Sequence, residues 1–242
     1  TGKTLLAEAM LFNGGVIERR GTIESKNTVS DYRPIEHENG NSLFSTVMYT
    51  EFQNKKINIL DTPGLDDFSG GVISSLYASD CAVLNINVQN GVEVGSEIHF
   101  RHAENVNKPL IIAVNGLDHE KANFDKSVEM MKDRFGNNVT IIQYPVNEGV
   151  GFNSVIDVLR MKLLQYPKEG GVAKVLDIPD DEAECRKIFE FGRKMGIETF
   201  MSEPKLEALN RLERFCDEYG INVAFHNHAR GQSPYWKPEL VL

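Results

Sequence analysis

Three short polar motifs follow one another along the chain and constrain its fold more than any other feature. They are Thr1-Gly2-Lys3-Thr4, Asp61-Thr62-Pro63-Gly64 and Asn115-Gly116-Leu117-Asp118. The second and the third each come directly after an apolar, strand-like run. Because the carboxyl ends of parallel strands meet at one edge of a sheet, the motifs are expected to converge there. Alone, they would be explained as a chance match, a surface turn and a helix N-cap, and only their order favours a common site.

The first motif has the residues that end a phosphate-binding loop. In such a loop, backbone N–H groups wrap the phosphates, a Lys reaches the β and γ oxygens, and a Ser or Thr hydroxyl binds Mg²⁺. Gly2, Lys3 and Thr4 fit these roles, but the strand and the first glycine of a full loop do not precede them. The chain is therefore interpreted as a fragment with a truncated P-loop.

Hydrophobic periodicity predicts that strands alternate with helices. We expect a first helix that ends near Asn13, and further helices at about 71–79, 97–106, 124–135 and 154–164. Strands are expected at about 43–52, 56–60, 81–88, 109–114 and 139–144. The polar stretch 18–42 is too long for an ordinary connection and is either disordered or a switch that a ligand orders. The pattern predicts an α/β fold, a truncated P-loop NTPase-like domain whose mostly parallel sheet has helices on both faces.

The second and third motifs suggest which nucleotide is bound. An aspartate at the end of a strand, such as Asp61, suits the Mg²⁺ at a phosphate loop, and Gly64 would place its N–H near the γ phosphate. Asn115 and Asp118 suit guanine, because a carboxylate accepts hydrogen bonds from N1–H and from the exocyclic amine. Adenine does not present donors in that pattern. The residues therefore predict GTP or GDP with Mg²⁺ rather than ATP.

Composition argues against several other classes. The net charge of −9 disfavours broad nucleic-acid binding, and no specific DNA binding is predicted. The apolar runs are strand-sized, so we predict no membrane segment and expect a cytoplasmic protein. Cys81, Cys185 and Cys216 lack metal-ligand spacing and are expected to be free thiols in a reducing compartment.

Residues 1–184 resemble the G domain of translation elongation factor G, in particular a divergent elongation-factor-G-like branch. The resemblance depends on the order of the motifs, on Lys56-Ile57-Asn58-Ile59-Leu60 before the second motif, and on Gly91-Val92-Glu93 followed by Ser96-Glu97. It implies a GTPase whose parent family works on the ribosome. By this resemblance the nucleotide contacts are Gly2, Lys3, Thr4, Asp61, Gly64, Asn115 and Asp118.

The same resemblance implies a metal set and reveals departures from the family. Ser42 takes the place of the first-switch Thr and, with Thr4 and Asp61, would hold Mg²⁺. Leu65 stands where the family has a His that orients the attacking water, which puts GTP hydrolysis in doubt while leaving binding largely intact. Gly116 replaces a Lys whose stem would pack over the base, so affinity should suffer. No catalytic residue is assigned.

The carboxyl-terminal residues differ in character. Residues 196–204 and 221–228, continuing to Trp236, resemble a strand-helix-strand slice of the sugar phosphate isomerase/epimerase family, a xylose-isomerase-like barrel. This resemblance implies a small βαβ piece of TIM-barrel type, with Glu203, His226 and His228 as ligands of a divalent metal. The simpler explanation is that these polar residues only cap two strands, since a closed barrel takes about 250 residues.

The sequence thus predicts three parts and leaves three functions open. The parts are a truncated GTP-binding domain at 1–167, a linker or insert at 168–184 and the isomerase-like piece at 185–242. The preferred function is a GTP-binding module derived from an elongation-factor-G-like GTPase. The alternatives are a metal-dependent sugar phosphate isomerase/epimerase fragment and an inactive chimaera of two truncated genes.

Overall fold

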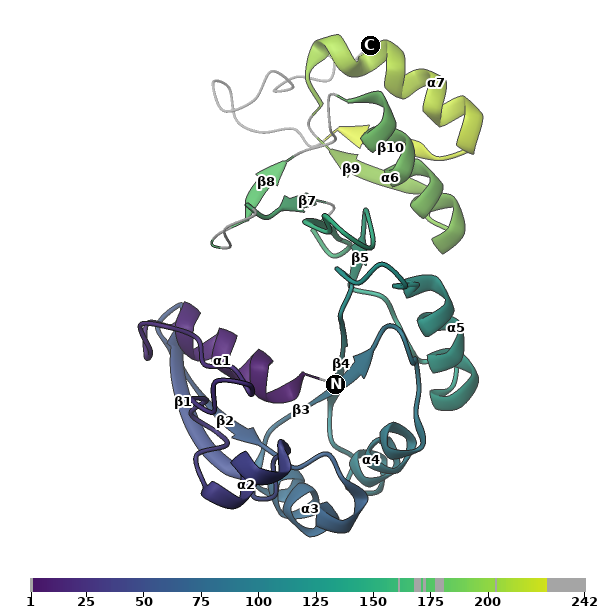
Figure 1. Cartoon of the computed structure of the whole chain (residues 1–242). Helices are drawn as coiled ribbons and strands as arrows, with labels where there is room; N and C mark the ends of the chain where they lie inside the picture. The colour runs from purple at the N-terminus through teal and green to yellow at the C-terminus, as the bar shows by residue number, and fades with distance from the viewer. Residues whose placement is uncertain are drawn as a thin grey trace. The chain divides into compact units, whose positions relative to one another are not determined.

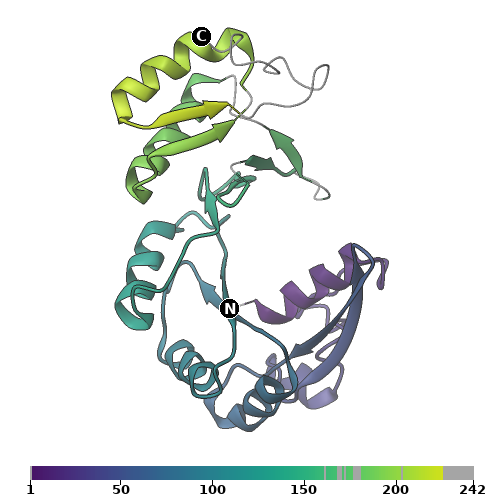
Figure 2. The ribbon, with the colours of Figure 1, turned by 180° about the vertical axis from the view of Figure 1, so that it is seen from behind.

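The computed structural model describes residues 2–160, 162–167, 171, 173–176, 181–202 and 204–225. The chain forms two compact units, Thr1–Val139 and Thr140–Leu242 (Figures 1 and 2). Each unit has its own hydrophobic cluster or clusters and is described by itself. Within the described part of the chain, no helix has the length and apolar character that a membrane crossing requires.

In the first unit, strands and helices alternate as the sequence predicts. The elements are α1 (Lys3–Asn13), α2 (Pro34–Asn39), β1 (Thr46–Phe52), β2 (Lys55–Asp61), η1 (Asp66–Phe68), α3 (Ser69–Ala78), β3 (Ala82–Asn87), α4 (Val94–Asn105), β4 (Leu110–Asn115) and α5 (Phe124–Phe135). The expected helix at 124–135 is confirmed with the same bounds, and the first helix ends at Asn13, where Gly14 caps it.

The strands of this unit form two pairs of different type. β3 and β4 are parallel, with Ala82 opposite Leu110, as expected for strands linked through a helix. β1 and β2 are antiparallel, whereas the sequence predicts a sheet that is mostly parallel and assigns no pairing to these two strands. Gln53 and Asn54 join them with φ values of 49° and 60°, and such a two-residue turn with positive φ values reverses the chain into a hairpin.

The helices cover these strand pairs through small apolar clusters. Ala7 and Leu11 of α1 pack with Met48 of β1. In a second cluster, Val72 of α3 packs with Ala103 of α4, next to Ala82 at the start of β3. Burial of these apolar faces fixes α1 on the hairpin and thereby places its first residues near the end of β2.

Two buried carboxylates hold the polar stretch 18–42 in place. Glu8 of α1 is 1% exposed and accepts hydrogen bonds from the backbone N–H groups of Gly21, at 2.7 Å, and Val29, at 2.6 Å. Glu36 of α2 is equally buried and accepts from the N–H groups of Leu43 and Phe44, at 3.0 and 3.1 Å. Hydrogen bonds to an ionised acceptor are stronger than those to a neutral one. The stretch is therefore ordered, and the alternative that it is disordered is wrong.

The second unit contains a four-stranded antiparallel sheet in the order β5-β6-β7-β8. Its strands are β5 (Gln143–Pro145), β6 (Ser154–Asp157), β7 (Lys162–Gln165) and β8 (Lys174–Leu176). β8 and the first residues of α6 thus fall within 168–184, which the sequence predicts to be a linker or insert.

The predicted helix at 154–164 is wrong, because this segment forms β6 and β7. The Asp157 carboxylate accepts a hydrogen bond from the backbone N–H of Arg160, at 3.0 Å, and pairs with its guanidinium at 3.1 Å, which favours a turn. Ile156 and Leu163 then lie opposite each other, each 2% exposed. The predicted strand at 139–144 is confirmed only at its end, where β5 begins at Gln143.

A strand-helix-strand arrangement completes the second unit, as predicted from the sequence. It consists of α6 (Glu182–Met195), β9 (Thr199–Ser202), η2 (Leu206–Ala208), α7 (Leu209–Tyr219) and β10 (Asn222–Phe225), with β9 and β10 parallel. Phe189, Phe200 and Phe215 are at most 1% exposed and form its centre, together with Ile156 of β6 and Leu163 of β7. The β6–β7 hairpin and the carboxyl-terminal helices and strands therefore share one hydrophobic core.

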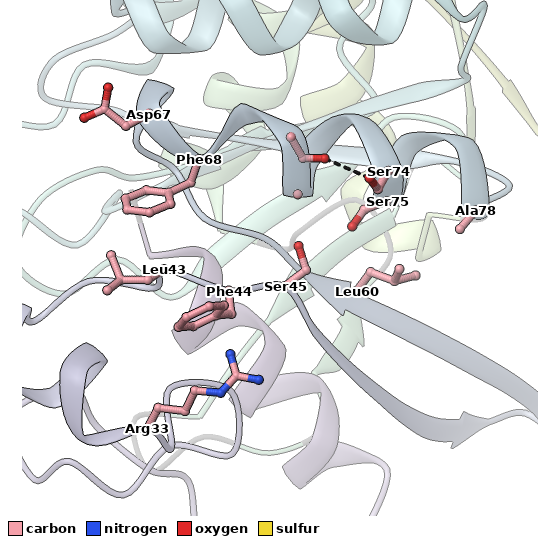
Figure 3. Close-up of a pocket in the computed structure, with 12 residues that line it drawn as sticks. Arg33, Leu43, Phe44, Ser45, Leu60, Asp67, Phe68, Ser74, Ser75 and Ala78 are labelled. Atoms are coloured by element: carbon pink, nitrogen blue, oxygen red, sulfur yellow. Dashed lines mark hydrogen bonds between the residues drawn. The ribbon is translucent and has the colours of Figure 1, made fainter.

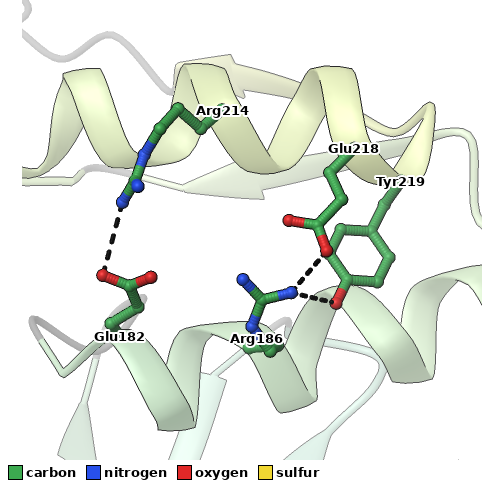
Figure 4. Close-up of polar contacts among 5 residues, drawn as sticks. All are labelled: Glu182, Arg186, Arg214, Glu218 and Tyr219. Carbon is green, nitrogen blue, oxygen red and sulfur yellow. Dashed lines mark hydrogen bonds and ion pairs between the residues drawn. The ribbon is translucent and has the colours of Figure 1, made fainter.

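Polar contacts join α6 to α7 at the surface of this core (Figure 4). Arg186 donates hydrogen bonds to Glu218 and to the Tyr219 hydroxyl, the latter at 3.0 Å, and Arg214 pairs with Glu182 at 3.3 Å. Such exposed ion pairs typically contribute less than about 1 kcal/mol each. The buried phenylalanines therefore dominate the packing of the two helices.

The three cysteines are free, as expected. Cys81 is exposed and Cys185 is buried. Burial raises the pKa of the Cys185 thiol to about 11, so that this thiol stays protonated and unreactive at neutral pH.

Replacing Glu8 with Ala should release the polar stretch from α1. The amides of Gly21 and Val29 lose their acceptor, at a cost of about 1.5–3 kcal/mol for each hydrogen bond to a charged group. Hydrogen exchange followed by mass spectrometry should show faster exchange at residues 18–31 in Glu8→Ala. The exposed Glu18→Ala serves as the control and should exchange as the wild type does. Equal exchange in both variants would contradict the role of Glu8.

Candidate nucleotide-binding site

The first turn of α1 meets the end of β2 and the end of the polar stretch. The Thr4 hydroxyl donates a hydrogen bond to Asp61 Oδ2 at 2.9 Å and lies 3.3 Å from the Ser42 hydroxyl oxygen. Thr4 is 7% exposed and Asp61 is 5% exposed. Three segments that are distant in sequence thus bring three oxygen atoms together; the motif order predicts the contact of Thr4 with Asp61, and the resemblance adds Ser42.

Lys3 lies against Gly64, just after the end of β2. A Cβ atom at Gly64 would collide with the Lys3 ammonium nitrogen, so the absence of a side chain there lets the lysine approach closely. Burial lowers the pKa of Lys3, and the negative charges of Asp61 and Asp31 oppose this shift. A desolvated ammonium group packed against a glycine is an arrangement that favours an anion such as a phosphate.

Gly2 connects this cluster to the end of β4. Its φ of 83° is in the left-handed region, and a Cβ atom there would meet the side-chain amide nitrogen of Asn115. Asn115 is the last residue of β4 and is exposed. Gly2, Lys3, Thr4, Ser42, Asp61, Gly64 and Asn115 are therefore gathered at one rim of the first unit.

Asp118 is exposed, in the turn that follows β4, three residues beyond Asn115. Gly116 begins this turn with a φ of 83°, which favours glycine over a lysine at the same backbone conformation. Leu65, 46% exposed, follows Gly64.

Sequence reasoning missed three acidic residues that shape the site. Glu8 and Glu36 hold the polar stretch in place, and Asp31, 5% exposed, lies within that stretch. Burial raises the pKa of Asp31, and the nearby Ser42 hydroxyl opposes this shift. Glu36 had a detectable signal, because Pro34 and Glu36 occupy the first and third positions of α2, where Pro and a capping Glu are common.

The oxygen cluster fits a magnesium ion in part. Mg²⁺ prefers oxygen ligands and is usually bound through one or two carboxylates, several waters and the phosphates of a nucleotide. Thr4, Ser42 and Asp61 supply two hydroxyl oxygens and one carboxylate. No group of three His, Cys, Asp or Glu side chains suited to a metal occurs in the described part of the chain. The donor set therefore suits a metal that a nucleotide helps to bind.

A pocket of about 590 Å³ lies beside the rim (Figure 3). It lies between the end of the polar stretch and α3 and includes Arg33, Phe44 and Phe68. The Arg33 guanidinium is over the Phe44 ring, 4.0 Å from its centroid. Lys3, Thr4 and Asp61 do not line this pocket, so it is separate from the oxygen cluster.

The predicted second metal site falls outside the described residues. Glu203, His226 and His228 are not among them, and only the preceding residues, Ser202 and Phe225, are placed, opposite each other in β9 and β10. Metal binding by the carboxyl-terminal piece therefore stays a prediction.

The fold and the rim together define an α/β nucleotide-binding domain of the P-loop NTPase type. Comparison with known proteins identifies it further: residues 1–210 match the family described as the elongation factor Tu GTP binding domain, and the chain belongs to that family. The match extends across β9, into the region where the sequence suggested a different family.

Curated relatives agree with this assignment. The chain is 32% identical to an elongation factor G-like protein of Thermotoga maritima over 77% of its length, and 36% identical to elongation factor G of Salinibacter ruber over 74%. It is 34% identical to the mitochondrial ribosome-releasing factor 2 of Candida dubliniensis over 82%. It spans about a quarter of each relative, 26% in all three cases.

A solved structure has the same fold. A crystal structure of a Thermus thermophilus protein superposes with a TM-score of 0.68 at 26% identity, over 93% of this chain and 35% of the other. The chain is thus a GTP-binding domain of the kind found in elongation-factor-G-like translation factors.

The burial of Lys3 predicts an unusual titration. Its pKa should lie below the ordinary lysine value, because desolvation disfavours the charged form, and Asp61→Asn should lower it further by removing a stabilising negative charge. NMR titration of the lysine side chains measures both shifts, with the exposed Lys126 as the internal reference. An unchanged or higher Lys3 pKa in Asp61→Asn would mean that the two side chains do not interact in solution.

Proposed function

We propose that the rim binds GDP or GTP together with Mg²⁺. The supporting observation is the hydrogen bond between Thr4 and Asp61, with Lys3 packed on Gly64 beside it. In this proposal Gly2, Lys3 and Thr4 contact the phosphates, and Gly64 contributes its N–H. The first turn of α1 directs further backbone N–H groups towards the same region, which favours an anion.

Asn115 and Asp118 would recognise the guanine base of the nucleotide. Asn115 is at the end of β4 next to Gly2, and Asp118 is exposed three residues later. The Asp118 carboxylate would accept two hydrogen bonds from guanine, which adenine cannot donate in the same geometry. Gly116 offers no side chain to cover the base, so we expect a weaker affinity than a lysine there would give.

Thr4, Ser42 and Asp61 would hold the magnesium ion. When bound, it would neutralise charge on the phosphate oxygens. The cluster forms with α1, β2 and the polar stretch already in contact, so little rearrangement is needed to receive a cation.

We propose that GTP is bound better than it is hydrolysed. Leu65 has no group that can hydrogen-bond a water molecule, and phosphoryl transfer depends on positioning of the nucleophile. Its exposure of 46% makes a packing role small.

We propose that the domain serves translation on the ribosome. The relatives named as elongation factor G and ribosome-releasing factor 2 support this partner. We also propose a cytoplasmic location, although one relative is named as mitochondrial.

Titration with fluorescent nucleotides tests the proposed ligand. With Mg²⁺ present, labelled GDP should bind and labelled ADP should bind at least about tenfold more weakly, since the site's base-reading groups would be left unpaired by adenine. Asp118→Ala should abolish this preference, and Lys3→Ala should weaken both nucleotides. Glu120→Ala, an exposed acid in the same turn, is the matched control. Equal binding of GDP and ADP by the wild type would refute the proposal.

Leu65→His should increase single-turnover GTP hydrolysis by at least about tenfold, a threshold set below the roughly 10²–10⁴-fold that a positioned proton-transfer group typically contributes. GDP affinity should stay unchanged, because the residue follows the phosphate contacts and is exposed. Leu65→Ala is the control for loss of the leucine. If alanine accelerates hydrolysis as much as histidine does, water orientation is not the missing function.

A further inference from the structure

The pocket beside the rim has the size and the lining of a small-molecule site (Figure 3). Its volume of about 590 Å³ lies within the range of roughly 300–1,000 Å³ that is typical of such sites. Ligand pockets are mostly apolar, with a few polar groups that fix the orientation of the ligand. The apolar side chains of this pocket are Leu43, Phe44, Leu60, Phe68 and Ala78. Its polar side chains therefore decide which class of ligand fits.

Arg33 brings a positive charge to the pocket without an acceptor for all of its N–H groups. Its Nη1 atom is buried and has no hydrogen-bond partner in the described part of the chain. The guanidinium lies over the Phe44 ring, 4.0 Å from the ring centroid, and Figure 3 shows it directed towards the space between the polar stretch and α3. A buried donor without an acceptor costs free energy, and more so in a charged group. Arg33 therefore favours an anionic partner.

Ser45, which precedes β1, adds a second donor. Its Oγ atom is likewise buried, and no hydrogen-bond partner for it is present among the residues that the structure describes. Gly71 of α3 makes room for this hydroxyl, because a Cβ atom there would lie 2.8 Å from Ser45 Oγ. By contrast, the Ser74 hydroxyl of the same lining already donates to the Gly70 carbonyl oxygen at 2.9 Å. A guanidinium and a hydroxyl from separate segments thus line one pocket with unused donors.

Asp67 also lines the pocket, but it does not pair with Arg33. It is exposed, and in Figure 3 its carboxylate points away from the Arg33 guanidinium. The positive charge of Arg33 is therefore not balanced by this acid.

We propose that this pocket binds a small aromatic carboxylate. The carboxylate accepts hydrogen bonds from Arg33 and Ser45, since a planar guanidinium matches a carboxylate in geometry. The aromatic body of the ligand packs against Phe44 and Phe68, because aromatic rings favour offset or edge-to-face contacts with one another. The site is separate from the oxygen cluster, and the proposal does not depend on the proposed function.

A purely structural role for Arg33 makes a different prediction. If the guanidinium only stabilised the end of the polar stretch by packing on Phe44, its replacement would lower stability, and the pocket would show no preference for an anion. A binding role instead requires that a carboxylate is preferred to a neutral analogue of the same shape. It also requires a contribution from Ser45.

The test uses 1-naphthaleneacetate as the probe and 1-naphthaleneacetamide as its neutral counterpart with the same aromatic body. Binding to the full chain without nucleotide is followed by NMR chemical-shift titration. The acid should bind at least about tenfold more tightly than the amide, because hydrogen bonds between charged groups are the stronger ones. Arg33→Met should weaken binding of the acid by at least about tenfold, and Ser45→Ala by about threefold or more. The exposed Arg19→Met is the matched control and should bind as the wild type does.

The position of the shift changes locates the probe. They should be largest at residues 43–45 and 67–75, which include the lining of the pocket. Thermal melting checks that each variant folds, and if Arg33→Met does not, Ser45→Ala and the comparison of acid with amide still decide the question. Equal affinity for acid and amide, wild-type affinity in a folded Arg33→Met, or no saturable binding of the acid would each overturn the proposal. Largest changes at Lys3 and Thr4 would do so too, because the acid would then occupy the oxygen cluster. Since no nucleotide is present, failure of this proposal leaves the nucleotide proposal standing.

Discussion

The contact between Thr4 and Asp61 is the interaction on which the rest of the site depends. It joins the first turn of a helix to the last residue of a strand 57 positions later. A buried hydrogen bond to a carboxylate is worth about 1.5–3 kcal/mol, and it fixes distance as well as energy. With this contact in place, Lys3 packs on Gly64 and Gly2 packs on Asn115, because each glycine leaves room for the side chain next to it. The geometry of the rim therefore follows from the Thr4–Asp61 hydrogen bond and from the absence of a Cβ atom at Gly2 and at Gly64.

Buried acids also explain why a long polar segment is ordered. The stretch 18–42 has few apolar groups to bury, so hydrophobic packing cannot hold it. Glu8 and Glu36 hold it by accepting four backbone N–H groups between them. The result places Ser42 beside Thr4. Order in this segment therefore depends on hydrogen bonds to two buried carboxylates, and loss of either acid should loosen the segment around Ser42.

Sequence alone was sufficient where the local pattern and the tertiary packing agree. The helix at 124–135 and the strand before Asp61 have strong periodicity and clear ends, and both were predicted. The hairpin at 154–165 was not, because Ile156 and Leu163 are apolar at a spacing that also suits a helix, and only pairing across the turn decides between the two. Of the site, residues within recognisable motifs were found. Asp31 was missed because its burial depends on how the polar stretch folds, which no periodicity records.

Nucleotide binding and GTP hydrolysis require different groups at such a rim. In the proposed function, the chain has the groups for binding but lacks one for hydrolysis. Phosphate and metal binding need converging donors and oxygens, which in the proposed function Lys3, Thr4 and Ser42 would provide from segments already packed together. Hydrolysis additionally needs a group that orients water, and an exposed leucine occupies the position after Gly64. Leu65 takes no part in the hydrogen bonds that join Thr4, Ser42 and Asp61, so a change there should alter the proposed hydrolysis without disturbing this cluster. In the proposed function, binding and hydrolysis are therefore separable.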